Sequence, residues 1–245
     1  MNDFKGFSIK AKAKEAEIYL YDEIGSGWFG GVSAKQFADE LKALGKLERI
    51  TVRLNSPGGD VFDGLAIHNI LKQNPAQVDM YVDGLAASIA SIIAMAGDSI
   101  NMAENAMMMI HEPWTMALGN AAEMREIADR LEKVSGVLLG TYTRRTGKDE
   151  QEIADLMVAE TWMTAQEALD MGFADSIVEE MQMAAHFDLD KFKFRHNPLA
   201  DKAKVEDKPE ADAKPDSEGE PMLPEPDLSC FDRGIERCEA ILNQK

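Results

Sequence analysis

The feature that most constrains this chain is an alternation that runs from about residue 17 to residue 181. Short apolar runs of strand length are followed by Gly- or Pro-containing turns and then by segments with helical amphipathic spacing. Repeated strand–turn–helix order is typical of an α/β domain whose strands pair largely in parallel. We therefore predict an α/β fold, within a domain that covers residues 1–188.

The boundaries follow from the apolar spacing and from the turn and cap residues. Ser33 is a predicted helix N-cap and Gly45 a predicted helix end. Strands are expected at 18–22, 49–55, 78–83, 99–102, 106–110 and 174–178, and helices at 33–44, 60–74, 86–96, 120–146, 149–158 and 165–171.

Charge and hydropathy exclude several classes of function. The chain carries 44 Asp and Glu against 26 Lys and Arg, for a formal net charge of −18. Phosphate backbones are bound through an excess of cations, so we expect no nucleic-acid partner. The most apolar stretch, 85–96, is shorter than the roughly 20 residues that a bilayer requires. The first residues lack the apolar core of a signal peptide, so a cytoplasmic protein without a membrane segment is expected.

The composition changes after about Asp188. Residues 189–227 are acidic and Pro-rich with few apolar side chains, which predicts a disordered linker. Residues 228–245 carry apolar side chains near helical spacing, which predicts a short amphipathic helix. That helix either docks on a partner or is a tail without one.

Three segments at element boundaries could carry chemistry. Asn55-Ser-Pro-Gly-Gly59 ends a strand at a turn whose amides would face outward at a helix start, which suits an oxyanion. Ser88 lies in the predicted first turn of the apolar helix, between small residues. His111 ends an apolar strand beside Pro113. Each of these three segments, taken alone, could have a purely structural role. Together and in this order they favour a functional site at the strand ends.

These segments, LNSPGG, GLAASIA and MIHEP, resemble the signature of ClpP, the proteolytic subunit of the Clp machine. The resemblance covers about residues 17–178 and includes the later stretch MTAQEALDMGFADSI. Its details look closest to the phage and prophage head-maturation proteases of this family. It implies a ClpP/crotonase-like spiral of ββα units, with the helix at 120–146 as a protruding handle.

The resemblance also implies roles for particular residues. Ser88 matches the nucleophile, His111 the general base, and the amides of Gly59 and Ile89 the oxyanion hole. The family usually has aspartate as the third triad member, whereas this chain has Glu160 at that position. A glutamate can orient a histidine, but its side chain is one methylene longer. Asp155 and Asp175 are the other candidates for this role.

A peptidase of this kind would cleave protein or peptide substrates without a cofactor or metal. The glycine-rich loop at 25–31 lacks the Gly-Lys-Ser/Thr ending of a phosphate loop, so ATP is not expected to bind this chain. The resemblance further implies a ring-forming homo-oligomer, with an AAA+ unfoldase or phage capsid proteins as candidate partners. The alternatives are a crotonase-fold acyl-CoA enzyme, a Ser-Lys peptidase, which His111 disfavours, and a non-catalytic assembly scaffold.

Overall fold

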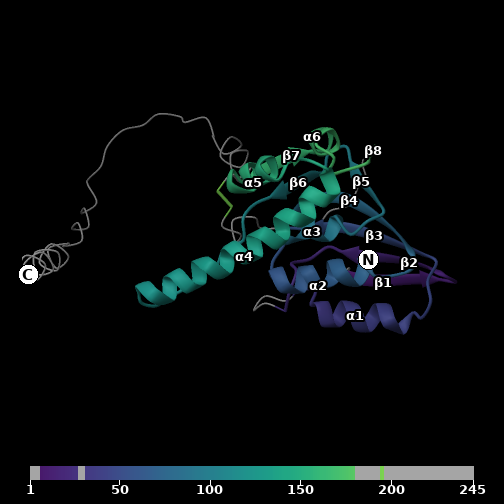
Figure 1. The fold of residues 1–245 in the computed structure, drawn as a ribbon. Helices are drawn as coiled ribbons and strands as arrows, with labels where there is room; N and C mark the ends of the chain where they lie inside the picture. Colours follow the sequence, from purple (N-terminus) through teal and green to yellow (C-terminus); the bar gives the residue numbers. More distant parts are fainter. Residues whose placement is uncertain (1–5, 27–30, 180–193, 196–245) are drawn as a thin grey trace, which may run out of the picture. The chain divides into compact units, whose positions relative to one another are not determined.

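The computed structural model describes residues 6–26, 31–179 and 194–195 (Figure 1). Apart from Phe194 and Arg195, the predicted linker and C-terminal helix lie outside the described residues. The elements, in chain order, are β1 (Phe7–Lys12), β2 (Glu15–Leu20), α1 (Ala34–Ala43), β3 (Arg49–Ser56), α2 (Val61–Lys72), β4 (Gln77–Ala87), α3 (Ile89–Ala94), β5 (Ser99–Ala103), β6 (Met107–Ile110), α4 (Ala121–Thr146), α5 (Glu150–Val158), β7 (Thr161–Thr164), α6 (Ala165–Asp170) and β8 (Ser176–Val178).

The described strands form one sheet in the order β1-β2-β3-β4-β5-β8. Every neighbouring pair along this path is parallel except the β1–β2 hairpin. Strand β6 pairs with β4 in parallel and with β7 in antiparallel orientation. The predicted α/β fold is therefore confirmed. The sequence did not indicate β1 or β7, which supply the two antiparallel pairings.

Local chemistry explains where the helices begin. The side chain of Ser33 accepts from the Gln36 amide at the start of α1, and Gly45 follows the helix with a φ of 73°, as predicted. Asp60 caps α2 by accepting from two amides of its first turn. Asn120 caps α4 in a capping box with Glu123. Each of these three helices therefore begins at a side chain that satisfies otherwise unpaired N–H groups.

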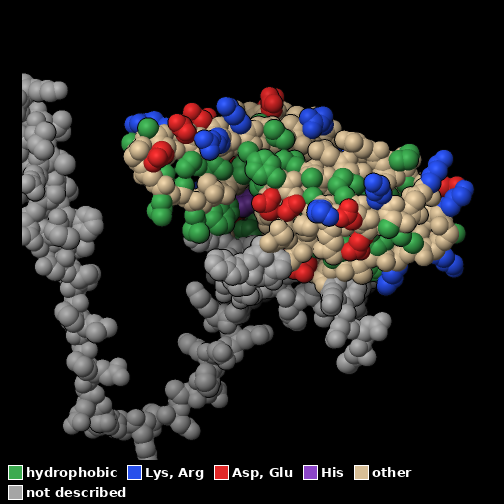
Figure 2. Space-filling view, turned by 90° about the horizontal axis from the view of Figure 1, so that it is seen from below, with side chains coloured by type: hydrophobic (Ala, Val, Ile, Leu, Met, Phe, Trp, Pro, Cys, Tyr) green, Lys and Arg blue, Asp and Glu red, His purple; other side chains and the backbone are tan. Residues whose placement is uncertain are grey.

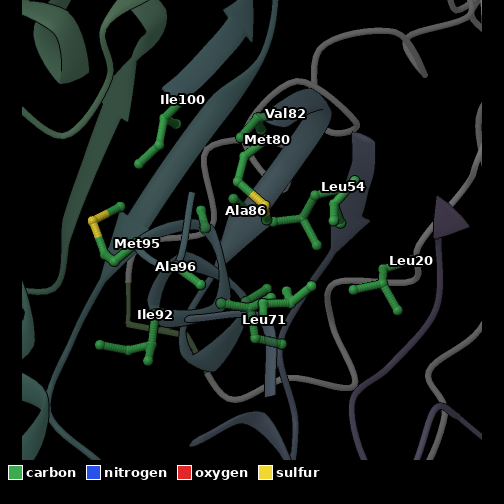
Figure 3. Packing of buried hydrophobic residues seen from close by; sticks show 14 of the residues in the cluster. Leu20, Leu54, Leu71, Met80, Val82, Ala86, Ile92, Met95, Ala96 and Ile100 are labelled. Atoms are coloured by element: carbon green, nitrogen blue, oxygen red, sulfur yellow. The ribbon is translucent and has the colours of Figure 1, made fainter. Parts of the chain in front are cut away.

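The core lies between the sheet and its helices (Figure 3). Apolar side chains on alternate positions of β2, β3, β4 and β5 pack against α2 and α3, as the labelled Leu20, Leu54, Met80 and Ile100 show. All six residues of α3 are buried. The prediction that this segment is a buried helix is therefore confirmed, although the helix begins later than expected.

Helix α4 differs from the other helices because only its C-terminal part is anchored. Its buried residues are Leu138, Thr141 and Tyr142, all in the second half. The N-terminal half projects away from the sheet (Figure 1). The helix predicted at 120–146 is thus present with nearly the expected bounds, and it protrudes.

Candidate active site

Ser88 lies at a sharp turn between strand and helix, which corrects the prediction that it sits inside a helix beginning at residue 86. Strand β4 continues to Ala87 because its last residues pair with β6, and α3 begins only at Ile89. Ser88 has φ 56° and ψ −128°, a conformation that costs an L-residue about 1–3 kcal/mol. Its amide donates to the Met109 carbonyl. The sequence is not Gly-x-Ser-x-Gly, yet the turn presents the hydroxyl as a nucleophile elbow does.

Parallel pairing of β4 with β6 brings the histidine to this serine. Ala87 is in register with Met109, so the residues just beyond these strands emerge at the same edge. His111 follows the last residue of β6, as the sequence predicted. Its Nε2 lies 2.7 Å from the Ser88 Oγ, within hydrogen-bond distance. The serine and the imidazole therefore have the contact that proton transfer requires.

Antiparallel pairing of β6 with β7 brings the carboxylate to the histidine. Ile110 is in register with Thr161, so the next positions outward are His111 and Glu160. The Glu160 Oε2 lies 3.9 Å from the His111 Nδ1, an ion-pair distance that is longer than a hydrogen bond. Glu160 itself has a φ of 53° at the tight turn between α5 and β7.

The other two candidate acids do not face the imidazole. Asp155 is exposed on α5 and accepts from Gln151. Asp175 accepts from the Ile100 amide and pairs with Arg145. Among the described acidic side chains, Glu160 is the one that forms an ion-pair contact with His111.

The imidazole and the carboxylate are both withdrawn from water. The His111 side chain is 10% exposed and that of Glu160 is 4% exposed. Burial lowers the pKa of His111 below its usual value, the Glu160 charge opposes this by raising the pKa, and the Arg195 charge lowers it further. A histidine with a lowered pKa is unprotonated at neutral pH, which is the form that accepts a proton.

The turn at Gly58 and Gly59 passes directly beside Ser88. A Cβ on Gly58 would lie 2.7 Å from the Ser88 Cβ, and one on Gly59 would lie 2.0 Å from the Ile24 carbonyl oxygen. Both glycines have positive φ. Within the part of the chain that the structure describes, the amides of Gly59 and Ile89 donate to no protein acceptor. Only glycine allows the backbone to approach the serine this closely.

A buried hydrogen-bond chain fixes the serine from behind. The Ser91 hydroxyl donates to the Ser88 carbonyl at 2.6 Å and lies 2.7 Å from the Tyr142 hydroxyl. Tyr142 is fully buried in the anchored half of α4, and this burial raises the pKa of its phenol. The strained turn is therefore connected to the handle helix by two hydroxyl groups.

A cavity of about 460 Å³ opens beside the Gly59 turn. Its lining includes Gly59, Phe62, Trp114, Met116 and Leu131, so it is mainly apolar. Phe62, Trp114 and Met116 are also exposed large hydrophobic residues. In Figure 2, hydrophobic side chains gather beside a hollow in the surface where a histidine is visible. The arrangement provides room for an apolar side chain near the serine.

A second cavity, of about 200 Å³, lies on the carboxylate side of the imidazole. Its lining includes His111, Trp114, Glu160 and Arg195. Trp162, which follows the carboxylate by two residues, places its Nε1 3.5 Å from the Glu160 Oε1. Trp114 and Trp162 therefore both pack beside the site.

Sequence reasoning missed several residues of this region. Gly58 was passed over in favour of Gly59, although the pair of adjacent glycines was the signal. Ser91 and Tyr142 carry no recognisable motif. Phe194 and Arg195 fall in the segment assigned to the linker, yet both contact the domain at His111 and Glu160.

The described residues form neither a metal-binding cluster nor a membrane-spanning helix. Within residues 6–26, 31–179 and 194–195, no group of three or more His, Cys, Asp or Glu side chains is arranged to hold a metal ion. None of the helices in these ranges is both long and apolar enough to span a bilayer.

A hydrogen-bonded serine and histidine beside a buried carboxylate, at the strand ends of an α/β sheet, is the arrangement of a serine hydrolase. Residues 6–181 match the family model of the Clp protease. The chain therefore belongs to the Clp protease family and is a serine-type peptidase, and its mixed α/β sheet agrees with the ClpP fold.

Two curated relatives illustrate the similarity. The chain is 32% identical over 169 residues to the ATP-dependent Clp protease proteolytic subunit 1 of Protochlamydia amoebophila (strain UWE25), covering 67% of this chain and 81% of that protein. It is 33% identical over 150 residues to the ATP-dependent Clp protease proteolytic subunit 2 of Thermobifida fusca (strain YX), covering 59% and 74%.

Proposed function

We propose that this protein is an endopeptidase of the ClpP type in which Ser88, His111 and Glu160 form the catalytic triad. The observation that carries this proposal is the 2.7 Å contact between the Ser88 Oγ and the His111 Nε2 at a strained turn. Glu160 is the described carboxylate beside the Nδ1 atom of the same ring. The amides of Gly59 and Ile89 form the oxyanion hole in this proposal.

The reaction is an acyl transfer in two halves. The His111 Nε2 takes the hydroxyl proton as the Ser88 Oγ attacks the peptide carbonyl, and the two amides stabilise the oxyanion. Glu160 stabilises the imidazolium that forms. The imidazolium then gives its proton to the leaving amine. Water, deprotonated by His111, releases the acyl group and regenerates the serine.

Substrate binding is supported by the cavity of about 460 Å³ beside Gly59. Apolar side chains such as Phe62, Met116 and Leu131 line it, so an apolar substrate side chain is favoured there. The substrates are therefore proteins or peptides with an apolar residue close to the cleaved bond.

Assembly and biological setting belong to the same proposal. The printed names of both relatives describe an ATP-dependent proteolytic subunit. A ring-forming homo-oligomer that receives substrate from an AAA+ unfoldase is one setting. A phage or prophage head-maturation protease that acts on capsid precursors is the other, and a cytoplasmic location fits both.

The first experiment asks whether Ser88 is a nucleophile. The purified protein is treated with a fluorophosphonate probe and assayed on fluorogenic peptides, beside Ser88→Ala and Ser99→Ala. Ser99 is a hydrogen-bonded strand serine that contacts Asp79, so its loss should leave labelling intact. Ser88→Ala should abolish labelling and lower cleavage by at least about 10⁴-fold. Wild-type protein that neither reacts nor cleaves would instead favour a non-catalytic scaffold or an acyl-CoA enzyme.

The second experiment asks whether Glu160 is the third member of the catalytic triad. Glu160→Gln keeps the size of the side chain but removes the charge that raises the pKa of His111. We expect kcat to fall by about tenfold to hundredfold, less than for a directly hydrogen-bonded acid, since the contact is 3.9 Å. The acid limb of the kcat/KM profile should move to lower pH. An unchanged profile, or an equal effect of Asp155→Asn, would exclude Glu160 from this role.

A further inference from the structure

Phe194 is anchored on the sheet beside the candidate site. It packs on an apolar cluster formed by β4, β6 and β7 that is separate from the main core. Its ring meets His111 edge-on with centroids 6.0 Å apart, and it meets Trp162 edge-on at 5.4 Å. The cluster consists of Leu85, Ala87 and Met109, with Met107, Trp162 and Phe194 packed against it.

Arg195 uses its backbone to hold the carboxylate. Its amide donates to the Glu160 Oε2 at 2.9 Å, and its guanidinium donates to the Val158 carbonyl at 3.3 Å. The Trp162 indole N–H lies 3.5 Å from the other carboxylate oxygen. The same Oε2 atom that faces the His111 Nδ1 is therefore bonded to the backbone of residue 195.

We propose that Phe194 and Arg195 form a strap that acts as a positioning element for Glu160 and shields His111 from water. The strap lies outside the family match, which ends at residue 181. The inference rests on the proposed triad, because it assigns the strap a role only through Glu160 and His111.

The contacts favour positioning over blockage of the site. Arg195 lines the cavity on the Nδ1 side of the imidazole, whereas Ser88 meets the Nε2 atom. Among the described residues that line the larger cavity beside Gly59, neither Phe194 nor Arg195 occurs. A substrate side chain bound in the larger cavity therefore does not displace the strap.

Charged and polar groups face His111 from three sides. Glu160 approaches from the turn before β7, Arg195 from the strap and Ser88 from the start of α3. Glu112 follows on the same loop and lines the same small cavity. Burial and the Arg195 charge both lower the pKa of His111. Removing either part of the strap should thus raise that pKa.

The first test separates the Arg195 amide from its side chain. Arg195→Ala and Arg195→Pro both lose the guanidinium, but only proline also loses the N–H that Glu160 accepts. Loss of a hydrogen bond to a charged group should lower kcat of the proline variant about tenfold below the alanine variant, with KM unchanged. Equal kcat values for the two variants would overturn the role of the amide.

The second test measures the pKa of His111 directly by NMR. Its imidazole resonances, assigned against a His111→Gln variant, are titrated in wild type, Phe194→Ala, Arg195→Ala and Arg195→Lys. Phe194→Ala should raise the pKa of His111 by admitting water, and Arg195→Ala should raise it by removing a positive charge. Arg195→Lys keeps the charge and should titrate like wild type.

A matched control is Arg125→Ala, which removes an exposed guanidinium that also donates to a backbone carbonyl, that of Ala121 on α4. It should leave the titration of His111 unchanged. If all strap variants titrate like wild type, the strap has no such role, whatever the activity. If wild type neither labels nor cleaves while the strap variants still shift His111, the contacts stand and the proposed peptidase function fails.

Discussion

At the scale of single residues, the site depends on how closely two backbone turns approach each other. Ser88 holds a positive φ because its amide is bonded to Met109 and its carbonyl to Ser91. Gly58 lies against Ser88 with a φ of 98°, a backbone conformation that residues with an L side chain rarely adopt. The serine is therefore held in its strained conformation by groups on both sides rather than by its own preference.

Gly58→Ala tests this close approach. The added Cβ would lie 2.7 Å from the Ser88 Cβ and 2.8 Å from the Ala87 carbonyl oxygen, so the serine or the Gly59 amide must move. We expect peptide kcat/KM to fall by at least about 10²-fold, as for loss of one oxyanion donor. The measurement is steady-state kinetics together with thermal unfolding.

The control is Gly45→Ala, which also has a positive φ of 73° but meets no heavy atom within 4 Å. It should lower the free energy of unfolding by about 1 kcal/mol and leave kcat/KM unchanged. If both variants lose activity equally, backbone strain rather than contact with Ser88 is the cause.

At the scale of elements, the position of Ser88 depends on β4, because this strand pairs with different neighbouring strands along its length. Its first part pairs with β5 and its last residues pair with β6. The β3–β4 register shifts between Leu54 and Ser56, where the Asn55 side chain accepts from the Leu85 amide. This irregularity lets one strand both build the core and deliver Ser88 to the end of β6.

A second link between elements joins α4 to α3 through two hydroxyl groups. Tyr142→Phe keeps the buried ring but leaves the Ser91 hydroxyl without the contact at 2.7 Å. We expect the free energy of unfolding to fall by about 1 kcal/mol and the melting temperature by about 2–4 °C. Denaturant and thermal unfolding measure both quantities.

Tyr81→Phe is the matched control, since Tyr81 is only half-buried and its ring contact with Arg53 does not need the hydroxyl. Its stability should stay within about 0.5 kcal/mol of wild type. A Tyr142→Phe protein as stable as this control would show that the hydroxyl chain contributes nothing.

At the scale of the whole molecule, the described residues include exposed apolar side chains and a projecting helix. Leu118 in the segment before α4 and Val137 on α4 are exposed, and the N-terminal half of α4 projects from the sheet and holds no fully buried residue (Figure 1). Large contiguous patches of exposed apolar surface mark contact with another protein. The exposed Leu118 and the projecting α4 agree with the proposed homo-oligomer, in which both would be covered.

Leu118→Asp should weaken that assembly, because burying an unpaired carboxylate is costly. We expect association to weaken by at least about tenfold, which corresponds to about 1.4 kcal/mol. Sedimentation velocity measures the distribution of species across protein concentration. Lys46→Asp, which also places a carboxylate at an exposed position, is the control and should assemble like wild type. Identical profiles for the two variants would remove Leu118 from the interface.

The sequence by itself determined the fold class and most element positions, and it indicated Ser88 and His111 as the candidate pair. Apolar spacing reveals strands and helices because side-chain burial repeats with the backbone period. The segments around Ser88 and His111 are short and contiguous, so they can be recognised without coordinates. Glu160 was indicated only by resemblance, and Asp155 and Asp175 remained as alternatives.

Only the tertiary structure decided which groups touch. Strand β7 has four residues, and its pairing with β6 is what places Glu160 rather than Asp175 beside the imidazole. The hydrogen bond from the Arg195 amide to that carboxylate joins positions 35 residues apart in the chain. Such contacts depend on register and on long-range packing, whereas local sequence patterns report only burial and turns.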